Sequence, residues 1–140
     1  IVSRGDKVLW NGENMDRKDL VRLGRRAVEN LPVHLIRQMQ EWYLTSSFRS
    51  YYGSWNYVEH LKRVKTPLHV ISGAADGLCP PADCKVAYDI IGTKEKRFSI
   101  FGTEHGHKID YGHIDLVLGI HAAREVYPEI LGWIEEFNGV

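Results

Sequence analysis

Two short apolar runs, each closed by a glycine, constrain the fold of this chain more than any other feature. The first covers residues 68–72 (Leu-His-Val-Ile-Ser) between Pro67 and Gly73, and the second covers residues 97–101 (Arg-Phe-Ser-Ile-Phe) before Gly102. Short β-branched and aromatic runs bounded by Pro or Gly are typical of buried strands in parallel sheets. We therefore predict two strands at these positions.

Helical patterns separate and follow the two predicted strands. Residues 81–91 lie between Cys79 and Gly92, and apolar side chains recur in them at helical spacing: Val86, Ala87, Ile90 and Ile91. Further helical patterns cover residues 115–124 and 127–137. The order strand, helix, strand predicts a βαβ unit with a right-handed crossover, so the expected fold class is α/β, with helices covering a parallel sheet.

The first 64 residues carry mainly helical patterns. Asp16 is placed to cap a helix, and Pro32 is placed to begin a second one. The apolar positions of the first helix are Leu20, Leu23, Ala27, Val28 and Leu31, and those of the second are Leu35, Ile36, Met39, Trp42 and Tyr43. A short third helix is predicted over residues 57–63. We therefore divide the chain into a helical segment, residues 1–64, and an α/β part, residues 65–140.

Composition and charge exclude several classes of protein. The 140 residues carry 18 Lys and Arg against 18 Asp and Glu, so the chain lacks the basic charge expected of a nucleic-acid-binding protein. It holds no apolar run of about 18 residues, so no membrane span is expected. Two cysteines, Cys79 and Cys84, are too few for a disulfide framework. We expect free thiols, and with them a reducing, cytoplasmic location.

Polar residues follow both predicted strands, where ligands bind in open parallel sheets. Asp76 lies in the turn after the first strand, and His113 lies in a long loop after the second. Because neighbouring strands lie about 5 Å apart, the two side chains can meet across one strand spacing. This geometry suits a carboxylate that orients an imidazole.

These segments resemble a known family. Residues 66–81 (Thr-Pro-Leu-His-Val-Ile-Ser-Gly-Ala-Ala-Asp-Gly-Leu-Cys-Pro-Pro) resemble the strand and turn that deliver the catalytic acid in α/β-hydrolases, and residues 110–116 (Asp-Tyr-Gly-His-Ile-Asp-Leu) resemble the segment of the catalytic histidine. Residues 119–128 are similar to lipase-like members and to hydrolase domains related to polyhydroxyalkanoate synthases. The resemblance implies the C-terminal part of an α/β-hydrolase fold, with residues 1–64 in the place of a cap or lid.

By this resemblance Asp76 is the triad acid and His113 the general base. The third member is missing, since no Gly-x-Ser-x-Gly elbow occurs in the sequence. Ser54, in Gly53-Ser54-Trp55, follows no predicted strand and lacks the second glycine. The chain begins at Ile1 without the pattern of a signal peptide, and we expect a truncated or processed product. The nucleophile, a serine or a cysteine, would then come from an upstream hydrolase portion.

The resemblance implies acyl transfer, with hydrolysis of a small ester or acyl substrate of the lipase and esterase kind and with no cofactor or metal. We expect the isolated chain to be inactive on simple aryl esters, because it has no nucleophile. We also expect it to self-associate, because the first strand would expose an unpaired edge.

Two alternatives remain open from the residues alone. One is a histidine-rich metal-binding loop formed by Glu104, His105, His107, Asp110 and His113. Zinc sites use such ligands, but the spacing His-Glu-x-x-His is absent. The other is a truncated or degenerate module without catalytic activity. A redox role for the cysteines is not predicted, because four residues separate them and the spacing is not Cys-x-x-Cys.

Overall fold

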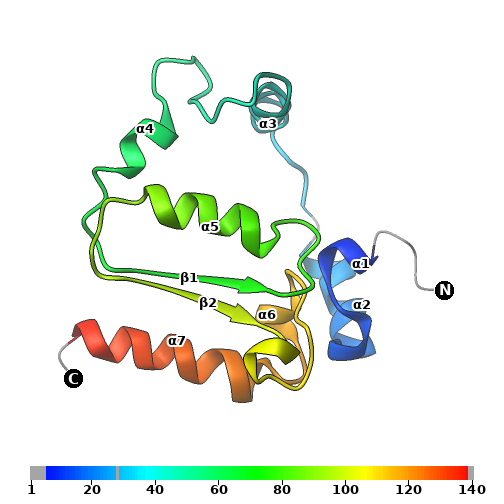
Figure 1. Cartoon of the computed structure of the whole chain (residues 1–140). Coiled ribbons are helices and arrows are strands. Elements are labelled where there is room, and N and C mark those ends of the chain that lie inside the picture. Colours follow the sequence, from blue (N-terminus) through cyan, green and yellow to red (C-terminus); the bar gives the residue numbers. More distant parts are fainter. Residues whose placement is uncertain (1–5, 28, 139–140) are drawn as a thin grey trace.

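The computed structural model describes residues 6–27 and 29–138 and confirms the predicted βαβ unit (Figure 1). Strands β1 (Leu68–Gly73) and β2 (Lys96–Phe101) pair in parallel, with Leu68 opposite Lys96 and Gly73 opposite Phe101. Helix α5 (Pro81–Ile90) covers one face of this sheet, and helix α7 (Ala122–Asn138) covers the other. The described part is therefore an α/β structure with a two-stranded parallel sheet.

Strand alternation distributes the side chains between the two helices. Phe98 contacts Tyr88 of α5, with ring centroids 5.4 Å apart. Phe101, three residues later, turns to the other face and is fully buried. The core there consists of Phe101, Tyr111, Leu116, Ala122 and Val126, with Ile71, Ile109 and Ile130 packed against it. This core lies between the sheet and α7, close to the carboxyl ends of both strands.

The C-terminal helices differ from the prediction. A single turn, α6 (Asp115–Leu118), replaces the helix expected over 115–124, and α7 begins at Ala122 instead of near residue 127. The chain bends at Gly119 because this residue lies against Asn14, and a Cβ at Gly119 would come within 2.6 Å of the Asn14 Nδ2. Pro128 lies inside α7 and does not mark its start.

The N-terminal part is helical, as predicted. After α1 (Asp6–Leu9) and a 3-10 turn (Gly12–Asn14) come α2 (Arg17–Arg26), α3 (Val33–Thr45) and α4 (Tyr57–Leu61). The Asp16 carboxylate accepts the Lys18 N–H at 2.6 Å, which confirms the cap. Helix α2 stops at Arg26, short of the expected Leu31, and Val28 lies outside the described residues.

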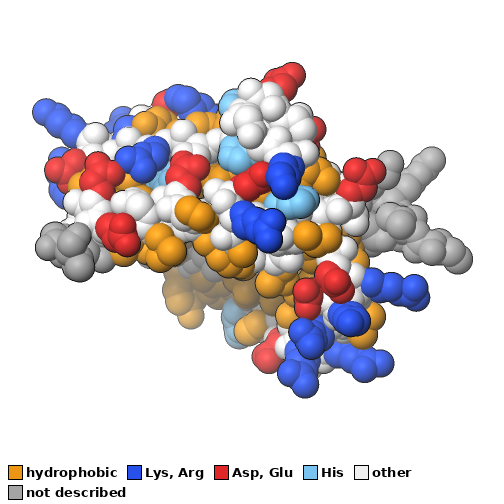
Figure 2. All heavy atoms as spheres, turned by 90° about the horizontal axis from the view of Figure 1, so that it is seen from below, with side chains coloured by type: hydrophobic (Ala, Val, Ile, Leu, Met, Phe, Trp, Pro, Cys, Tyr) orange, Lys and Arg blue, Asp and Glu red, His pale blue; other side chains and the backbone are white. Residues whose placement is uncertain are grey.

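We expected the apolar face of α3 to be buried, but the other described residues do not cover it. Leu35, Ile36, Met39 and Tyr43 are all exposed. Trp42 is the exception, since its ring contacts Phe48 with centroids 4.4 Å apart. Figure 2, seen from the side of α7, also shows hydrophobic side chains exposed between charged ones. None of the helices in the described ranges has both the length and the apolar character needed to cross a bilayer.

Candidate functional site

The structure brings Asp76 and His113 together. Asp76 lies in the turn after β1, His113 lies in the loop after β2, and the His113 Nδ1 is 2.8 Å from the Asp76 Oδ2. The expected contact is therefore confirmed. The Asp76 side chain is only 3% exposed, whereas that of His113 is 46% exposed. The acid is thus buried behind an imidazole that reaches the surface.

The turn after β1 orients the Asp76 carboxylate. Its Oδ1 accepts the N–H groups of Leu78 at 2.9 Å and of Cys79 at 2.8 Å. Aspartate side chains often close turns by accepting N–H groups two or three residues ahead. Because the turn occupies Oδ1, the other oxygen remains free to face His113. The local sequence after Asp76 thus sets the direction of the acid.

A close backbone approach carries the histidine loop over the end of β1. The Ala75 N–H donates to the Tyr111 O at 2.8 Å. A Cβ at Gly73 would lie 2.2 Å from the same oxygen, so only glycine fits there. The Tyr111 side chain is fully buried, and its hydroxyl donates to the Glu125 Oε2 at 2.7 Å. Burial, followed by this hydrogen bond, raises the pKa of Tyr111, so it remains a neutral donor at ordinary pH.

Asp115 fixes the turn that carries His113 by accepting the N–H group of the neighbouring Gly112. It was not among the residues predicted for the site. It is fully buried, and its Oδ1 accepts the N–H groups of Gly112 at 2.9 Å and of Asn11 at 3.1 Å. Its Oδ2 accepts the Asn14 Nδ2 at 2.9 Å. In the sequence Asp115 has only the pattern of an aspartate at the start of a helix. Nothing local indicates that two of its partners, Asn11 and Asn14, lie about a hundred residues away.

The segment from Leu9 to Asn14 therefore belongs with the histidine loop. Besides the bonds to Asp115, the Asn11 Nδ2 donates to the Asp110 O at 2.8 Å, and the Ile114 N–H donates to the Leu9 O at 2.9 Å. Figure 1 shows α1 and α2 beside α6, at the end of the sheet to which both strands point. The division near residue 64 stays a prediction, but these six residues pack with the α/β part.

Three of the five donors of the alternative metal site, His107, Asp110 and His113, make other contacts. The Asp110 Oδ1 accepts the Thr103 N–H at 2.7 Å and the Thr103 hydroxyl at 2.9 Å, and these bonds lower the pKa of Asp110. The His107 Nδ1 lies 3.1 Å from both the N and the O of Gly102, and its ring contacts Phe101. Across residues 6–27 and 29–138, no three His, Cys, Asp or Glu side chains are placed to share a metal ion.

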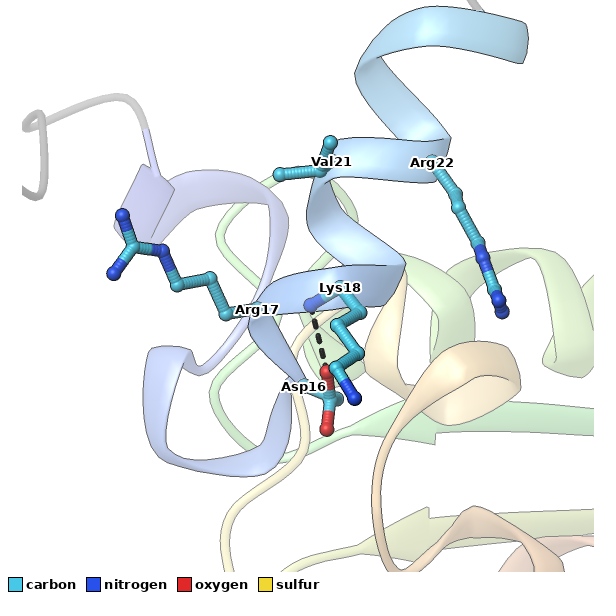
Figure 3. Close-up of a pocket in the computed structure, with 5 residues that line it drawn as sticks. All are labelled: Asp16, Arg17, Lys18, Val21 and Arg22. Carbon is cyan, nitrogen blue, oxygen red and sulfur yellow. Dashed lines mark hydrogen bonds between the residues drawn. The ribbon is translucent and has the colours of Figure 1, made fainter.

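Ser54 lies in the loop between α3 and α4, and its Oγ is 3.4 Å from the Ser50 Oγ. Within the described residues no hydrogen bond joins it to His113. The surface also has an open hollow of about 620 Å³, lined by Asp16, Arg17, Lys18, Val21 and Arg22 (Figure 3). All five residues come from the start of α2, and Arg17 and Arg22 extend outward. This hollow is a solvated helix face, and it contains neither Asp76 nor His113.

Comparisons with protein-family models, with characterised proteins and with solved structures found no match to this chain. Any functional conclusion therefore depends on the geometry of the residues themselves.

Proposed function

We propose that this chain is the C-terminal part of an α/β-hydrolase that cleaves carboxylic esters by acyl transfer, with Asp76 and His113 as two members of its triad. The observation that supports the proposal best is the 2.8 Å contact between the His113 Nδ1 and the Asp76 Oδ2. It joins the ends of two adjacent parallel strands, in the chain order acid then histidine.

The contact defines what each side chain would do. Asp76 holds the imidazole with its Nδ1 protonated, so the Nε2 is left as the base. The Nε2 takes the proton of the nucleophile as that group attacks the ester carbonyl, and it then gives the proton to the leaving alcohol. In the second half, the Nε2 takes a proton from the water molecule that attacks the acyl group. It then gives this proton to the nucleophile, whose bond to the acyl group breaks as the carboxylic acid is released. Asp76 stabilises the imidazolium in both halves.

The nucleophile and the oxyanion hole would come from a segment outside these 140 residues, because the sequence has no nucleophile elbow. Part of the proposal is also that the protein works in the cytoplasm, since Cys79 and Cys84 are free thiols.

The test is hydrolysis of p-nitrophenyl esters by two proteins: the 140-residue chain, and the longest translated product that contains it. We expect turnover only in the longer protein. There, Asp76→Asn should lower kcat by about 10⁴-fold, because the imidazole then takes the wrong tautomer, and His113→Ala should be at least as damaging. The matched control is His105→Ala, an exposed histidine of the same loop, which should retain full activity.

Three outcomes would overturn the proposal. One is turnover in the longer protein that survives His113→Ala. Another is robust turnover by the isolated chain that is lost on Ser54→Ala. The third is absence of turnover on every ester tested, together with no labelling of the longer protein by a fluorophosphonate or an alkylating probe, which would favour a module without catalytic activity.

A further inference from the structure

The two cysteines meet in space although their spacing in sequence did not suggest it. The Cys79 Sγ and the Cys84 Sγ are 3.3 Å apart, and the Cys84 Sγ also lies 3.5 Å from the Cys79 O. Both residues are free and half-buried, so small reagents can reach them. The chain between them turns at Pro80 and enters α5 at Pro81, which folds the first turn of the helix back onto Cys79.

We propose that Cys79 and Cys84 are a redox modification site, in which a low-molecular-weight disulfide such as oxidised glutathione converts the two thiols into a reversible intramolecular disulfide. Formation of the bond needs the two sulfur atoms to move about 1.3 Å closer, since a disulfide measures about 2.0 Å. A shift of this size is within reach of side-chain rotation at the half-exposed N-terminus of a helix. The proposal goes beyond ester hydrolysis and does not depend on it.

The exchange balances without any further reagent. The Cys84 thiolate attacks one sulfur of the small disulfide, breaks its S–S bond and releases one small thiol. The Cys79 sulfur then loses its proton and attacks the Cys84 sulfur of the mixed disulfide, which releases the second small thiol. The protein thiols are oxidised by two electrons, and the small disulfide is reduced by two.

The order of the two attacks follows from the surroundings of Cys79. Burial, and then its hydrogen bond with Cys84, raises the pKa of Cys79 to about 11, so Cys79 is the poorer first nucleophile. Once the Cys84 sulfur is part of a mixed disulfide, that hydrogen bond and the repulsion from a Cys84 thiolate are gone. Cys79 is then already in contact with the sulfur that it must attack.

The cysteine site is joined to the Asp76–His113 pair by a hydrogen bond. The Cys79 N–H donates to the Asp76 Oδ1 at 2.8 Å, and the Asp76 Oδ2 contacts the His113 Nδ1. A disulfide would add a second covalent link between Cys79, whose N–H group holds the Asp76 carboxylate, and Cys84 in the first turn of α5. We therefore infer that oxidation changes the environment of the His113 ring. In a reducing compartment the bond would form only under oxidising conditions.

Mass spectrometry tests the modification. The reduced, folded chain is incubated with oxidised glutathione, quenched in acid and digested with trypsin, which leaves both cysteines in the single peptide 66–85. We expect this peptide to become lighter by two hydrogen atoms, without lasting glutathione adducts, and to revert with dithiothreitol. The variants Cys79→Ser and Cys84→Ser should retain glutathione adducts or remain unmodified. A stable adduct on the wild-type chain, disulfide-linked dimers or unreacted thiols would overturn the proposal.

A spectroscopic measurement tests the coupling to Asp76. The ring nitrogen and Nδ1–H resonances of His113 are followed by NMR before and after oxidation. They should shift in the wild-type chain and return on reduction, while the same treatment of Cys84→Ser should leave them unchanged. If the disulfide forms and the His113 resonances stay in place, the inferred coupling is wrong, although the modification site stands.

Discussion

Replacement of Asp115 by alanine should destabilise this protein more than any other single loss of a carboxylate that we can identify. The change removes three hydrogen bonds and leaves the N–H groups of Asn11 and Gly112 and the Asn14 Nδ2 without an acceptor. An unpaired buried donor costs about 1–3 kcal/mol, and three donors lose their acceptor here. We expect a loss of about 4 kcal/mol in the free energy of unfolding, or roughly 15 °C in melting temperature.

Asp115→Asn tests how much of this stabilisation requires a carboxylate, because asparagine has nearly the same size and shape. The new amide would present an N–H group to the Asn14 Nδ2, which is also a donor. A flip of the Asn14 amide would relieve this clash, but its Oδ1 already accepts the His121 N–H at 3.3 Å. We expect an intermediate loss of about 2 kcal/mol.

Urea unfolding monitored by circular dichroism measures these losses, and NMR of the His113 ring reports whether the turn keeps its place. Asp89→Ala is the matched control. Its carboxylate is exposed and, among the described residues, pairs with Lys85 one turn earlier in α5. Stability should therefore change by less than about 0.5 kcal/mol. A loss below about 1 kcal/mol for Asp115→Ala, with unchanged His113 resonances, would refute the role that we assign to this carboxylate.

Three further predictions concern backbone fit, pH and association. Gly73→Ala should unfold the chain or displace the histidine loop, because the new Cβ would lie 2.2 Å from the Tyr111 O. Gly24 lies in open space on α2, so Gly24→Ala should instead stabilise the chain by about 0.5–1 kcal/mol. Thermal melts of both variants test these two expectations. Burial lowers the pKa of His69, although the nearby Glu129 carboxylate acts in the opposite direction. As the pH falls through 6.5, the unfolded chain therefore binds a proton at this histidine before the folded chain does. The free energy of unfolding then decreases below that pH, by at most about 1.4 kcal/mol per pH unit. His69→Gln should flatten this slope between pH 7.5 and 5.5 in urea titrations, and an unchanged slope would contradict the assignment. Sedimentation over a wide concentration range should show self-association through the edge of β1 that pairs with no other described strand. A clean 16.1 kDa monomer at high concentration would contradict this prediction.

Sequence patterns correctly predicted those structural elements that depend on residues close together in the chain. The strands at Leu68 and Lys96 follow from β-branched and aromatic runs bounded by Pro and Gly, and the structure has them within one residue of the expected bounds. Asp16 caps α2 because its acceptor reaches an N–H only two residues ahead. The pairing of Asp76 with His113 was also predictable, because adjacent parallel strands end at the same edge of a sheet.

The ends of the C-terminal helices were not predictable in this way. Residues 115–124 have a continuous helical pattern, but the packing of Gly119 against Asn14 breaks it, and this contact joins residues that are far apart in the sequence. The apolar stripe of α3 likewise predicted a buried face, yet Met39 and its neighbours are exposed. A periodic pattern indicates that a helix is amphipathic, but it does not identify the surface that would cover it.

Local sequence therefore determined the two strands, the Asp16 cap and the meeting of Asp76 with His113. Each of these depends on residues within a few positions of one another or on the order of two strands. Tertiary structure alone decides that Asp115 is a buried acceptor for Asn11 and Asn14, and that the sulfur atoms of Cys79 and Cys84 lie 3.3 Å apart. The first depends on partners about a hundred residues away, and the second on the exact path of a turn. Neither the residue type nor the spacing carries that information, because the contacts exist only once the chain has closed on itself.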